Sequence, residues 1–361
     1  GTTLVGGLAG EMTNGSTINT SSNSGSVTGD GERVGGVVGN MAGGTSLYAV
    51  SNSGAVTNNK DTQATGGLAG KNEGSIKKSY NAGAVTSKGS WTGGIAGKNN
   101  GDIGGIDAAD SVYNTGEVSG YGYTGGVAGL NEGCIAGVYN AGTVHAHGER
   151  TGGLTGQNSG TIKNSYNKGI VDIYNVSYGG GIAGYNEGTI ENVHNDSTIS
   201  LNCERSTSEK QYYGGIVGYM EKGRLSNAYN TGNVENKSKN VSSVKYVGGV
   251  IGCMKNLTLS GLYNTGAVSG YEYVGGIVGY MGNASLSEVY NTGAVTGING
   301  STAKEDSAAI GGIVGMTDNV GAIHISNAYN TGAIQGGSYI GGIAGLLNRN
   351  GYISKVYNTG T

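Results

Sequence analysis

Residues 66–97, GGLAGKNEGSIKKSYNAGAVTSKGSWTGGIAG, contain one complete repeat and the start of the next. The repeat opens with a pentapeptide of the form Gly-Gly-(Leu/Val/Ile)-x-Gly. The first glycines of its twelve copies are Gly6, Gly35, Gly66, Gly93, Gly125, Gly152, Gly180, Gly214, Gly248, Gly275, Gly311 and Gly341. A regular spacing of about 30 residues is typical of proteins built from stacked repeats.

A second motif, (Tyr)-Asn-x-Gly-x-(Val/Ile), alternates with the first. Clear copies are residues 80–85 and 263–268, and the step from Asn to Val or Ile is four residues in every complete copy. Insertions fall mainly between that Val or Ile and the next Gly-Gly pair. A core of constant length with length variation at one corner is typical of a solenoid, because loops can be accommodated at a corner.

Each repeat is expected to form three short strands. The first is the Gly-Gly segment, and a turn such as 72–74 follows, with Asn and Gly suited to a positive φ. The second strand begins at Ile or Leu and ends at Tyr-Asn, and the third follows the Asn-x-Gly turn. Helices are not expected, because each interior Gly costs about 1 kcal/mol in a helix.

The second strand indicates which side chains point inward. Its columns run from an invariant Ile or Leu, such as Ile76, through two often polar positions, such as Lys77 and Lys78, to a small or apolar position such as Ser79. This in–out–out–in order predicts a bend inside the strand. The following Tyr is expected outward or at the corner, and the Asn inward, where its amide can pair with the coils above and below.

The repeats together predict an all-β fold. We expect a right-handed parallel β-solenoid of about twelve coils with three short strands per coil, spanning residues 1–361 as one domain. The chain starts inside a repeat and neither end shows a polar cap. We therefore expect either a fragment of a longer protein or bare ends that stack head to tail into a filament.

The composition excludes several classes of protein. The 361 residues include 76 Gly but no Pro and no Phe, and the formal net charge is −3. This charge gives no reason to expect a nucleic-acid partner, and no apolar run is long enough for a transmembrane segment. The three cysteines, Cys134, Cys203 and Cys253, fall at different points of the repeat, so neither a disulfide framework nor a thiolate metal site is expected.

These glycine motifs resemble the GLUG-motif repeat family. The matches Gly67-Leu68-Ala69-Gly70 and Gly153-Leu154-Thr155-Gly156 belong to an array that covers essentially the whole chain. The family occurs in large bacterial surface and secreted proteins, including regions outside the catalytic domain of IgA-cleaving metallopeptidases. The resemblance implies a scaffold or adhesive role and an extracellular or cell-surface location on a bacterium.

No catalytic residues are predicted. The four histidines form no HExxH motif, and His145 and His147, which would share one face of a strand, have no evident third ligand nearby. The carboxylates lie mostly in turns or long loops rather than clustered on one sheet face. We therefore expect neither a metal nor a cofactor, and no enzymatic activity.

A column of aromatic residues is the best candidate for binding. Its rings could stack on one another and stabilise the sheet, or present a platform for glycan rings. The column consists of Tyr80, Tyr113, Tyr139, Tyr166, Tyr229, Tyr263, Tyr290, Tyr329 and Tyr357, with His194 in the equivalent slot of one coil. The long corner loops 201–213, 235–246 and 297–309 are a second candidate, for protein recognition.

The function expected from these features is structural. The chain would be a rigid stalk, spacer or adhesin module of a secreted or surface-anchored bacterial protein. Its expected partners are a host or cell-surface glycan or protein, together with further copies of itself. The alternatives are a subunit of a head-to-tail extracellular filament and a β-helix that binds or acts on polysaccharide.

Overall fold

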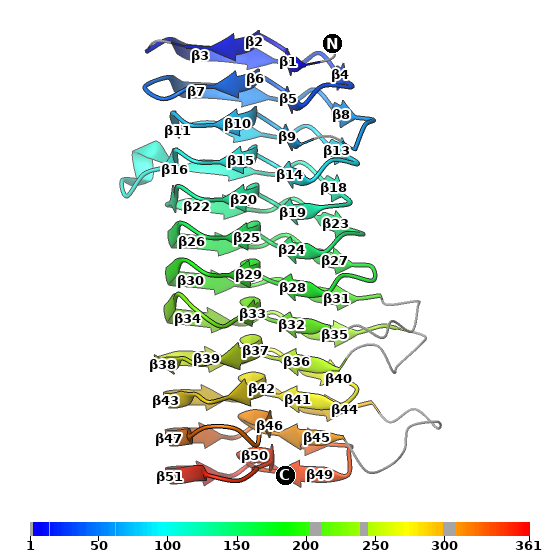
Figure 1. The fold of residues 1–361 in the computed structure, drawn as a ribbon, viewed down its shortest axis with the longest axis vertical. Helices are drawn as coiled ribbons and strands as arrows, with labels where there is room; N and C mark the ends of the chain where they lie inside the picture. Colours follow the sequence, from blue (N-terminus) through cyan, green and yellow to red (C-terminus); the bar gives the residue numbers. More distant parts are fainter. Residues whose placement is uncertain (1–2, 14, 62, 203–210, 239–244, 299–307) are drawn as a thin grey trace. The chain divides into compact units, whose positions relative to one another are not determined.

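The computed structural model describes residues 3–361, apart from 14, 62, 203–210, 239–244 and 299–307 (Figure 1). The chain divides into two compact units. Unit 1 comprises Gly1–Asp172 and Gly188–Ile190, and unit 2 comprises Ile173–Glu187 and Glu191–Thr361. Both units are stacks of β-coils.

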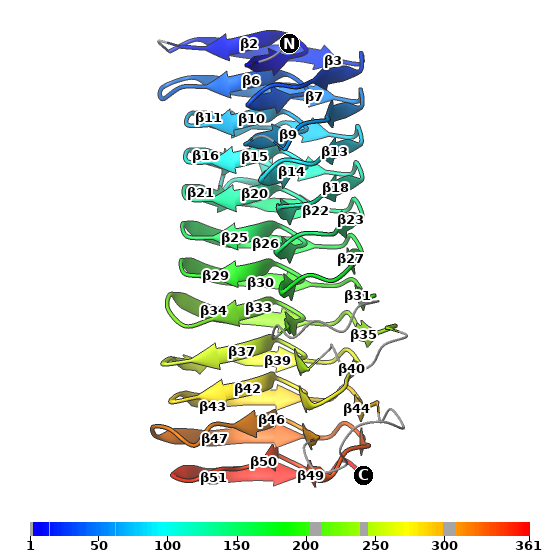
Figure 2. The same ribbon diagram turned by 45° about the vertical axis from the view of Figure 1, so that its right-hand side comes forward.

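Unit 1 contains parallel strands that fall into four ladders, named sheets A to D in the order in which each coil visits them (Figure 2). Sheet A has β1 (Leu4–Gly6), β5 (Arg33–Gly35), β9 (Ala64–Gly66), β14 (Trp91–Gly93), β19 (Tyr123–Gly125) and β24 (Arg150–Gly152). Sheet B has β2 (Ala9–Met12), β6 (Val38–Met41), β10 (Ala69–Asn72), β15 (Ala96–Asn99), β20 (Ala128–Asn131) and β25 (Thr155–Asn158). Sheet C has β3 (Thr17–Asn23), β7 (Ser46–Asn52), β11 (Ser75–Lys77), β12 (Tyr80–Asn81), β16 (Asp102–Gly104), β17 (Val112–Asn114), β21 (Cys134–Ala136), β22 (Val138–Asn140) and β26 (Thr161–Asn167). Sheet D has β4 (Val27–Gly29), β8 (Val56–Asn58), β13 (Val85–Ser87), β18 (Val118–Gly120), β23 (Val144–Ala146) and β27 (Val171–Ile173).

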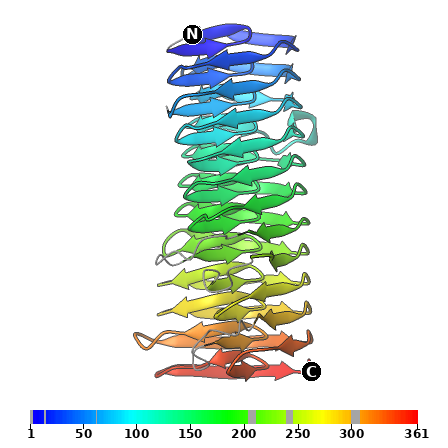
Figure 3. The ribbon, with the colours of Figure 1, turned by 90° about the vertical axis from the view of Figure 1, so that its right-hand side faces the viewer.

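Unit 2 repeats the same order of strands. Its coils are coloured from green to red in Figure 3. Sheet A has β28 (Tyr178–Gly180), β32 (Tyr212–Gly214), β36 (Tyr246–Gly248), β41 (Tyr273–Gly275), β45 (Ala309–Gly311) and β49 (Tyr339–Gly341). Sheet B has β29 (Ala183–Asn186), β33 (Val217–Met220), β37 (Ile251–Lys255), β42 (Val278–Gly282), β46 (Val314–Thr317) and β50 (Ala344–Leu346). Sheet C has β30 (Thr189–Asn195), β34 (Arg224–Asn230), β38 (Thr258–Ser260), β39 (Leu262–Asn264), β43 (Ser285–Asn291), β47 (Ile323–Asn330) and β51 (Gly351–Asn358). Sheet D has β31 (Ile199–Leu201), β35 (Val234–Asn236), β40 (Val268–Gly270), β44 (Val295–Gly297) and β48 (Ile334–Gln335).

The register pairs equivalent residues of successive repeats. In unit 1, Tyr80 pairs with Tyr113 and Asn81 with Asn114, all in parallel. The predicted all-β parallel β-solenoid is therefore confirmed, with about twelve coils in the described residues. The first of the three predicted strand segments is bent at its Gly-Gly pair, so it contributes one short strand to sheet A and another to sheet B.

The only helix among the described residues is a short 3-10 turn. This helix, η1 (Ala108–Asp110), lies in an insertion between β16 and β17 that projects beside sheet C (Figure 1). Its Asp110 carboxylate accepts a 3.0 Å hydrogen bond from the Lys77 ammonium. That hydrogen bond and the accompanying charge attraction raise the pKa of Lys77.

The bend predicted inside the second strand is confirmed. Ile76 and Ser79 are fully buried, while Lys77 and Lys78 point outward. Lys78 has a φ of 49°, and Glu288, the equivalent residue in a coil of unit 2, has a φ of 54°. One left-handed residue in the middle of the strand turns the chain, which places the positions before and after it in the core.

The prediction of a positive φ in the turn at 72–74 is wrong. No residue of this described turn adopts a left-handed backbone. The turn forms through a side chain instead, because the amide oxygen of buried Asn72 accepts a 3.1 Å hydrogen bond from the Gly74 N–H. An Asn side chain can close a turn in this way without a strained backbone.

The Tyr-Asn motif places a continuous ladder of asparagines inside each unit. In unit 1 each amide donates both to its own turn and to the next coil: Asn81 Nδ2 lies 2.8 Å from the Gly83 carbonyl oxygen and 2.8 Å from Asn114 Oδ1. The same ladder runs through Asn195, Asn230, Asn264, Asn291, Asn330 and Asn358 in unit 2. The predicted inward-facing Asn column is confirmed, and its polar atoms are satisfied.

The Gly-Gly pair makes room for this ladder. A Cβ added to Gly94 would lie 2.2 Å from the Gly126 carbonyl oxygen and 2.4 Å from Asn114 Cγ. Equivalent close approaches occur at Gly67 and Gly126 in unit 1 and at Gly276 in unit 2. The second glycine of each pair therefore packs under an asparagine, which couples the two sequence motifs physically.

We predict that Gly94→Ala destabilises the protein by about 3 kcal/mol, because backbone atoms of the next coil must shift to admit the methyl group. The matched control is Gly43→Ala, at a turn glycine with no atom within 4 Å of an added Cβ. Gly43→Ala should change the free energy of unfolding by less than about 1 kcal/mol. Denaturant unfolding of both variants measures the difference, and equal effects would contradict the proposed packing.

We predict that Asn114→Ala costs about 3 kcal/mol, because it removes the partners of Asn81 Nδ2, Asn140 Oδ1 and the Gly116 carbonyl. The control is Asn100→Ala, at an exposed asparagine that donates to Glu132. Its unfolding free energy should stay within about 0.5 kcal/mol of the parent value. A ladder substitution as mild as the surface one would argue against a structural role for the ladder.

Candidate functional site

The predicted tyrosine column forms a stack of rings along sheet C in unit 1. Successive ring centroids are 5.0 Å apart for Tyr80 and Tyr113, 5.0 Å for Tyr113 and Tyr139, and 5.2 Å for Tyr139 and Tyr166. The planes deviate from parallel by 2° to 6°. The parallel register of sheet C produces this stack, because it places equivalent residues directly next to one another.

The column is also continuous in unit 2. It runs from His194 through Tyr229, Tyr263, Tyr290 and Tyr329 to Tyr357, with neighbouring centroids 4.6 to 5.0 Å apart. His194 stacks on Tyr229 at an interplanar angle of 3°, so the imidazole takes the place of a phenol ring without breaking the stack.

This stacking decides what the tyrosine column can offer to a ligand. Tyr113 and Tyr139 have a neighbouring ring on each face, so their edges and hydroxyl groups are what reach solvent. Burial also raises the pKa of Tyr113 and of Tyr139 above the ordinary value. The geometry favours the stabilising role for the column, and a glycan platform at these residues stays a prediction.

Two further columns of outward side chains lie on either side of the bend between sheets A and B. In unit 1 the first residue of each sheet A strand faces the third residue of the following sheet B strand. The Arg33 guanidinium donates to Asn40 Oδ1 at 2.9 Å, and Lys98 Nζ lies 5.1 Å from the centroid of the Trp91 ring. We call this surface the A/B groove. It is defined by Arg33, Ala64, Trp91, Tyr123 and Arg150 on one side and by Asn40, Lys71, Lys98, Leu130 and Gln157 on the other.

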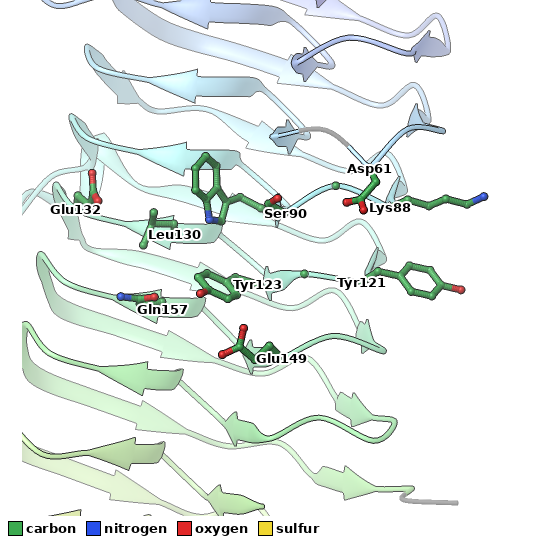
Figure 4. Close-up of a pocket in the computed structure, with 12 residues that line it drawn as sticks. Asp61, Lys88, Ser90, Tyr121, Tyr123, Leu130, Glu132, Glu149 and Gln157 are labelled. Atoms are coloured by element: carbon green, nitrogen blue, oxygen red, sulfur yellow. The ribbon is translucent and has the colours of Figure 1, made fainter. Parts of the chain in front are cut away.

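The A/B groove of unit 1 contains a recess of about 540 Å³. It is bordered by the sheet A residues Trp91 and Tyr123 and the sheet B residues Leu130 and Gln157. Figure 4 shows Tyr123, Leu130 and Gln157 on neighbouring strands, with Tyr121 directed away from Tyr123. The turns between sheets D and A complete the recess with Asp61, Lys88, Gly89, Ser90, Tyr121, Gly122 and Glu149, and Glu132 lies beyond Leu130.

Charged residues around this recess are paired, one pair between neighbouring coils and one within a coil. Lys98 Nζ lies 2.9 Å from the Glu132 carboxylate, and Arg150 lies 3.3 Å from Glu149. Burial acts to raise the pKa of Glu132, but hydrogen bonds from Lys98 and Asn100 together with the charges of nearby lysines hold the pKa below its ordinary value. Glu132 is therefore a carboxylate at neutral pH.

The A/B groove of unit 2 is filled by tyrosine rings instead. Tyr212 and Tyr246 are only 8% exposed and pack with fully buried Cys253. Tyr178, Tyr219, Tyr273 and Tyr280 surround them, in stacked and edge-to-face contacts such as that of Tyr212 with Tyr219 at 5.2 Å. Burial raises the pKa of Tyr212, Tyr219 and Tyr246, and it raises the pKa of Tyr280 to about 12.

The sequence contained a signal for the A/B groove that the motif analysis did not use. The residue two positions before each Gly-Gly pair includes Trp91 and Tyr123 in unit 1 and Tyr178, Tyr212 and Tyr246 in unit 2. Aromatic residues recurring at one outward position indicate an aromatic column on the outside of the coils. Their pairing with the sheet B column depends on the angle of the Gly-Gly bend, which the sequence pattern does not specify.

The histidines and cysteines considered in the sequence analysis form no common site in the part of the chain that the structure describes. His145 lies on β23 with Nδ1 3.3 Å from the Asp172 carboxylate, whereas His147 lies beyond the strand and stacks on Tyr121 at 5.2 Å. Within the described ranges no group of three or more His, Cys, Asp or Glu residues is placed to hold a metal ion. Cys134 is a free thiol whose pKa is raised by burial, and Cys253 is fully buried among the unit 2 tyrosines.

Some predicted features lie outside the described residues. Cys203 is one of them, and so are most of the corner loops 201–213, 235–246 and 297–309. In the part of the chain that is described, no helix has the length and apolar character needed to cross a membrane.

Comparison of the sequence with models of known protein families gives no match. No curated protein and no solved structure matches the chain either. The resemblance to the GLUG-motif family therefore stays a prediction that rests on the glycine motifs themselves.

We predict that the protein loses stability as the pH rises above about 10, the ordinary tyrosine pKa. The folded state holds the phenol protons of the unit 2 tyrosines to higher pH than the unfolded chain does, so unfolding releases protons in this range. Denaturant unfolding should show constant stability from pH 7 to 9 and a steady fall above pH 10.

Absorbance of tyrosinate at 295 nm provides the direct readout. The unfolded chain in concentrated guanidinium chloride should titrate all 24 tyrosines in one step. The folded chain should show a second step at higher pH, and Tyr212→Phe should reduce that step. A single step in the folded chain at the same pH as in the unfolded chain would contradict the burial of these rings.

Proposed function

We propose that this chain is a non-catalytic structural repeat region. It would act as a rigid stalk, spacer or adhesin module of a secreted or cell-surface bacterial protein. The observation that carries the proposal is a pair of buried asparagine ladders, the Tyr-Asn column on sheet C and a second column on sheet B. They hydrogen-bond one coil to the next, so each coil depends on its neighbours in both directions.

The second ladder strengthens this argument for unit 1. Asn72, Asn99, Asn131 and Asn158 on sheet B are fully buried, and the amides of the first three each donate to the asparagine of the next coil at 2.7 to 2.8 Å. Two hydrogen-bonded side-chain columns therefore run along the interior of unit 1, in addition to the backbone ladders. A stack whose interior polar groups are satisfied by adjacent coils resists local opening, which a load-bearing spacer requires.

The resemblance of Gly67–Gly70 and Gly153–Gly156 to GLUG motifs supports a surface location. The small net charge and the outward tyrosine column are compatible with a module that displays a regular face to its surroundings. Assembly into a head-to-tail filament stays a prediction.

Stretching a single molecule by its two ends tests the mechanical role. A spacer should lengthen in steps that each release about 30 residues, since successive coils repeat at that interval. Asn114→Ala should lower the force of the step that contains it, whereas Asn100→Ala should leave the force unchanged. Extension at low force without steps would contradict a load-bearing role.

Antibody labelling of intact cells that produce the protein containing this chain tests the location. Labelling without permeabilisation is expected, with a cytoplasmic protein as the negative control. Labelling only after permeabilisation would overturn the proposed surface or secreted setting.

A further inference from the structure

We propose that the recess between Trp91 and Tyr123 in unit 1 binds a neutral oligosaccharide, with one sugar ring placed against the Trp91 indole. This inference goes beyond the proposed spacer function and does not depend on it. It rests on the aromatic walls, the polar groups and the charge balance of the recess.

The two aromatic walls belong to adjacent strands. Trp91 on β14 and Tyr123 on β19 are paired in register, yet among the described residues no ring contact joins them. The tyrosines of sheet C, at the same coil spacing, stack directly on one another. Trp91 and Tyr123 are thus not stacked on each other, and both border the recess.

A cation lies over each of the two rings. Lys98 lies 5.1 Å from the centroid of the Trp91 ring and borders a separate, smaller recess with Arg33, Lys71 and Trp91. The Arg150 guanidinium, which comes from the following coil, lies 4.6 Å from the centroid of the Tyr123 ring. Neither cation borders the main recess, so the ring surfaces that line it are available to a ligand.

A sugar ring suits these walls because its C–H face is apolar and can pack on an aromatic face, while its hydroxyl groups point sideways. The sides of the recess offer matching partners. Beyond its bonds with Arg150 and Ser159, the Gln157 amide keeps one N–H and one oxygen lone pair for a ligand. The Ser90 hydroxyl can both donate and accept hydrogen bonds, and the Glu132 carboxylate accepts them. Its volume lies within the usual range for small-molecule sites, which combine apolar surface with a few polar groups.

The charges favour a neutral ligand. The three acidic residues at the recess, Asp61, Glu132 and Glu149, are balanced by three basic residues in or beside it, Lys88, Lys98 and Arg150. Two of the acids are already paired with a base, as Glu132 is with Lys98 and Glu149 with Arg150. An anionic polymer would find no excess of positive charge here.

The fluorescence of Trp91 can report ligand binding directly, because Trp91 is the only tryptophan in the chain. We expect that titration with neutral tetrasaccharides of glucose, mannose, galactose or N-acetylglucosamine produces a saturable change in tryptophan fluorescence for at least one of them. The affinity for a neutral ligand should change less than about twofold between low and high salt.

Substitutions test whether the oligosaccharide binds at the recess. Tyr123→Ala and Gln157→Ala keep the reporter and should each weaken binding about tenfold or more. Trp91→Ala, followed by calorimetry, should abolish binding, and Trp91→Phe should retain part of it. Tyr48→Ala is the matched control, because this exposed tyrosine of β7 lies outside both the recess and the sheet C tyrosine column. It should bind like the unsubstituted chain, with circular dichroism confirming that every variant is folded.

Three results would overturn the proposal. The first is the absence of a saturable response to all four tetrasaccharides at millimolar concentrations. The second is binding that Trp91→Ala and Tyr123→Ala leave unchanged. The third is a strong preference for a sulfated tetrasaccharide or a peptide, with affinity that falls steeply with salt. The force and labelling experiments address the spacer function separately, so the two proposals can fail independently.

Discussion

The packing of an asparagine amide against a backbone without a Cβ is the contact on which the rest of this structure depends. Asn114 lies against Gly94, and its amide bonds both its own turn and the next coil. Any side chain at the glycine would separate the coils, and any apolar residue at the asparagine would leave the turns unsatisfied. The two most regular motifs of the sequence are therefore two halves of one interaction.

Because the interior is determined by repetition, variation is confined to the outside of each coil. On sheet C the outward tyrosines form a continuous stack of rings within each unit, such as Tyr113 on Tyr139. The outward residues of the A/B groove differ between the two units. In unit 1 its aromatic rings are separated and capped by cations, whereas in unit 2 the rings of Tyr212, Tyr219 and Tyr246 contact one another around Cys253. The same backbone thus presents an open recess in one unit and a closed aromatic cluster in the other.

Much of the fold could be predicted because it follows local periodicity. The in–out–out–in order around Lys78 predicted a bend that the backbone shows as a left-handed residue, and the Tyr-Asn order predicted one outward and one buried column. The turn at Asn72 was predicted wrongly, since Asn and Gly are compatible with a positive φ but do not require it. There the Asn72 side chain decided the conformation, because its amide oxygen accepts from the Gly74 N–H within the turn. Its Nδ2 donates to Asn99 of the next coil, and this tertiary contact is absent from the local sequence.

The sequence by itself determined the class of fold, the length of a coil and the residues that face the interior, because each of these is repeated about twelve times at constant spacing. Only the tertiary structure decided how the outward columns meet. Trp91 and Lys98 are seven residues apart and carry no shared motif, yet the bend at the Gly-Gly pair brings the ammonium over the indole. The angle of that bend arises from coil-to-coil packing, so the A/B groove exists only once the coils are stacked.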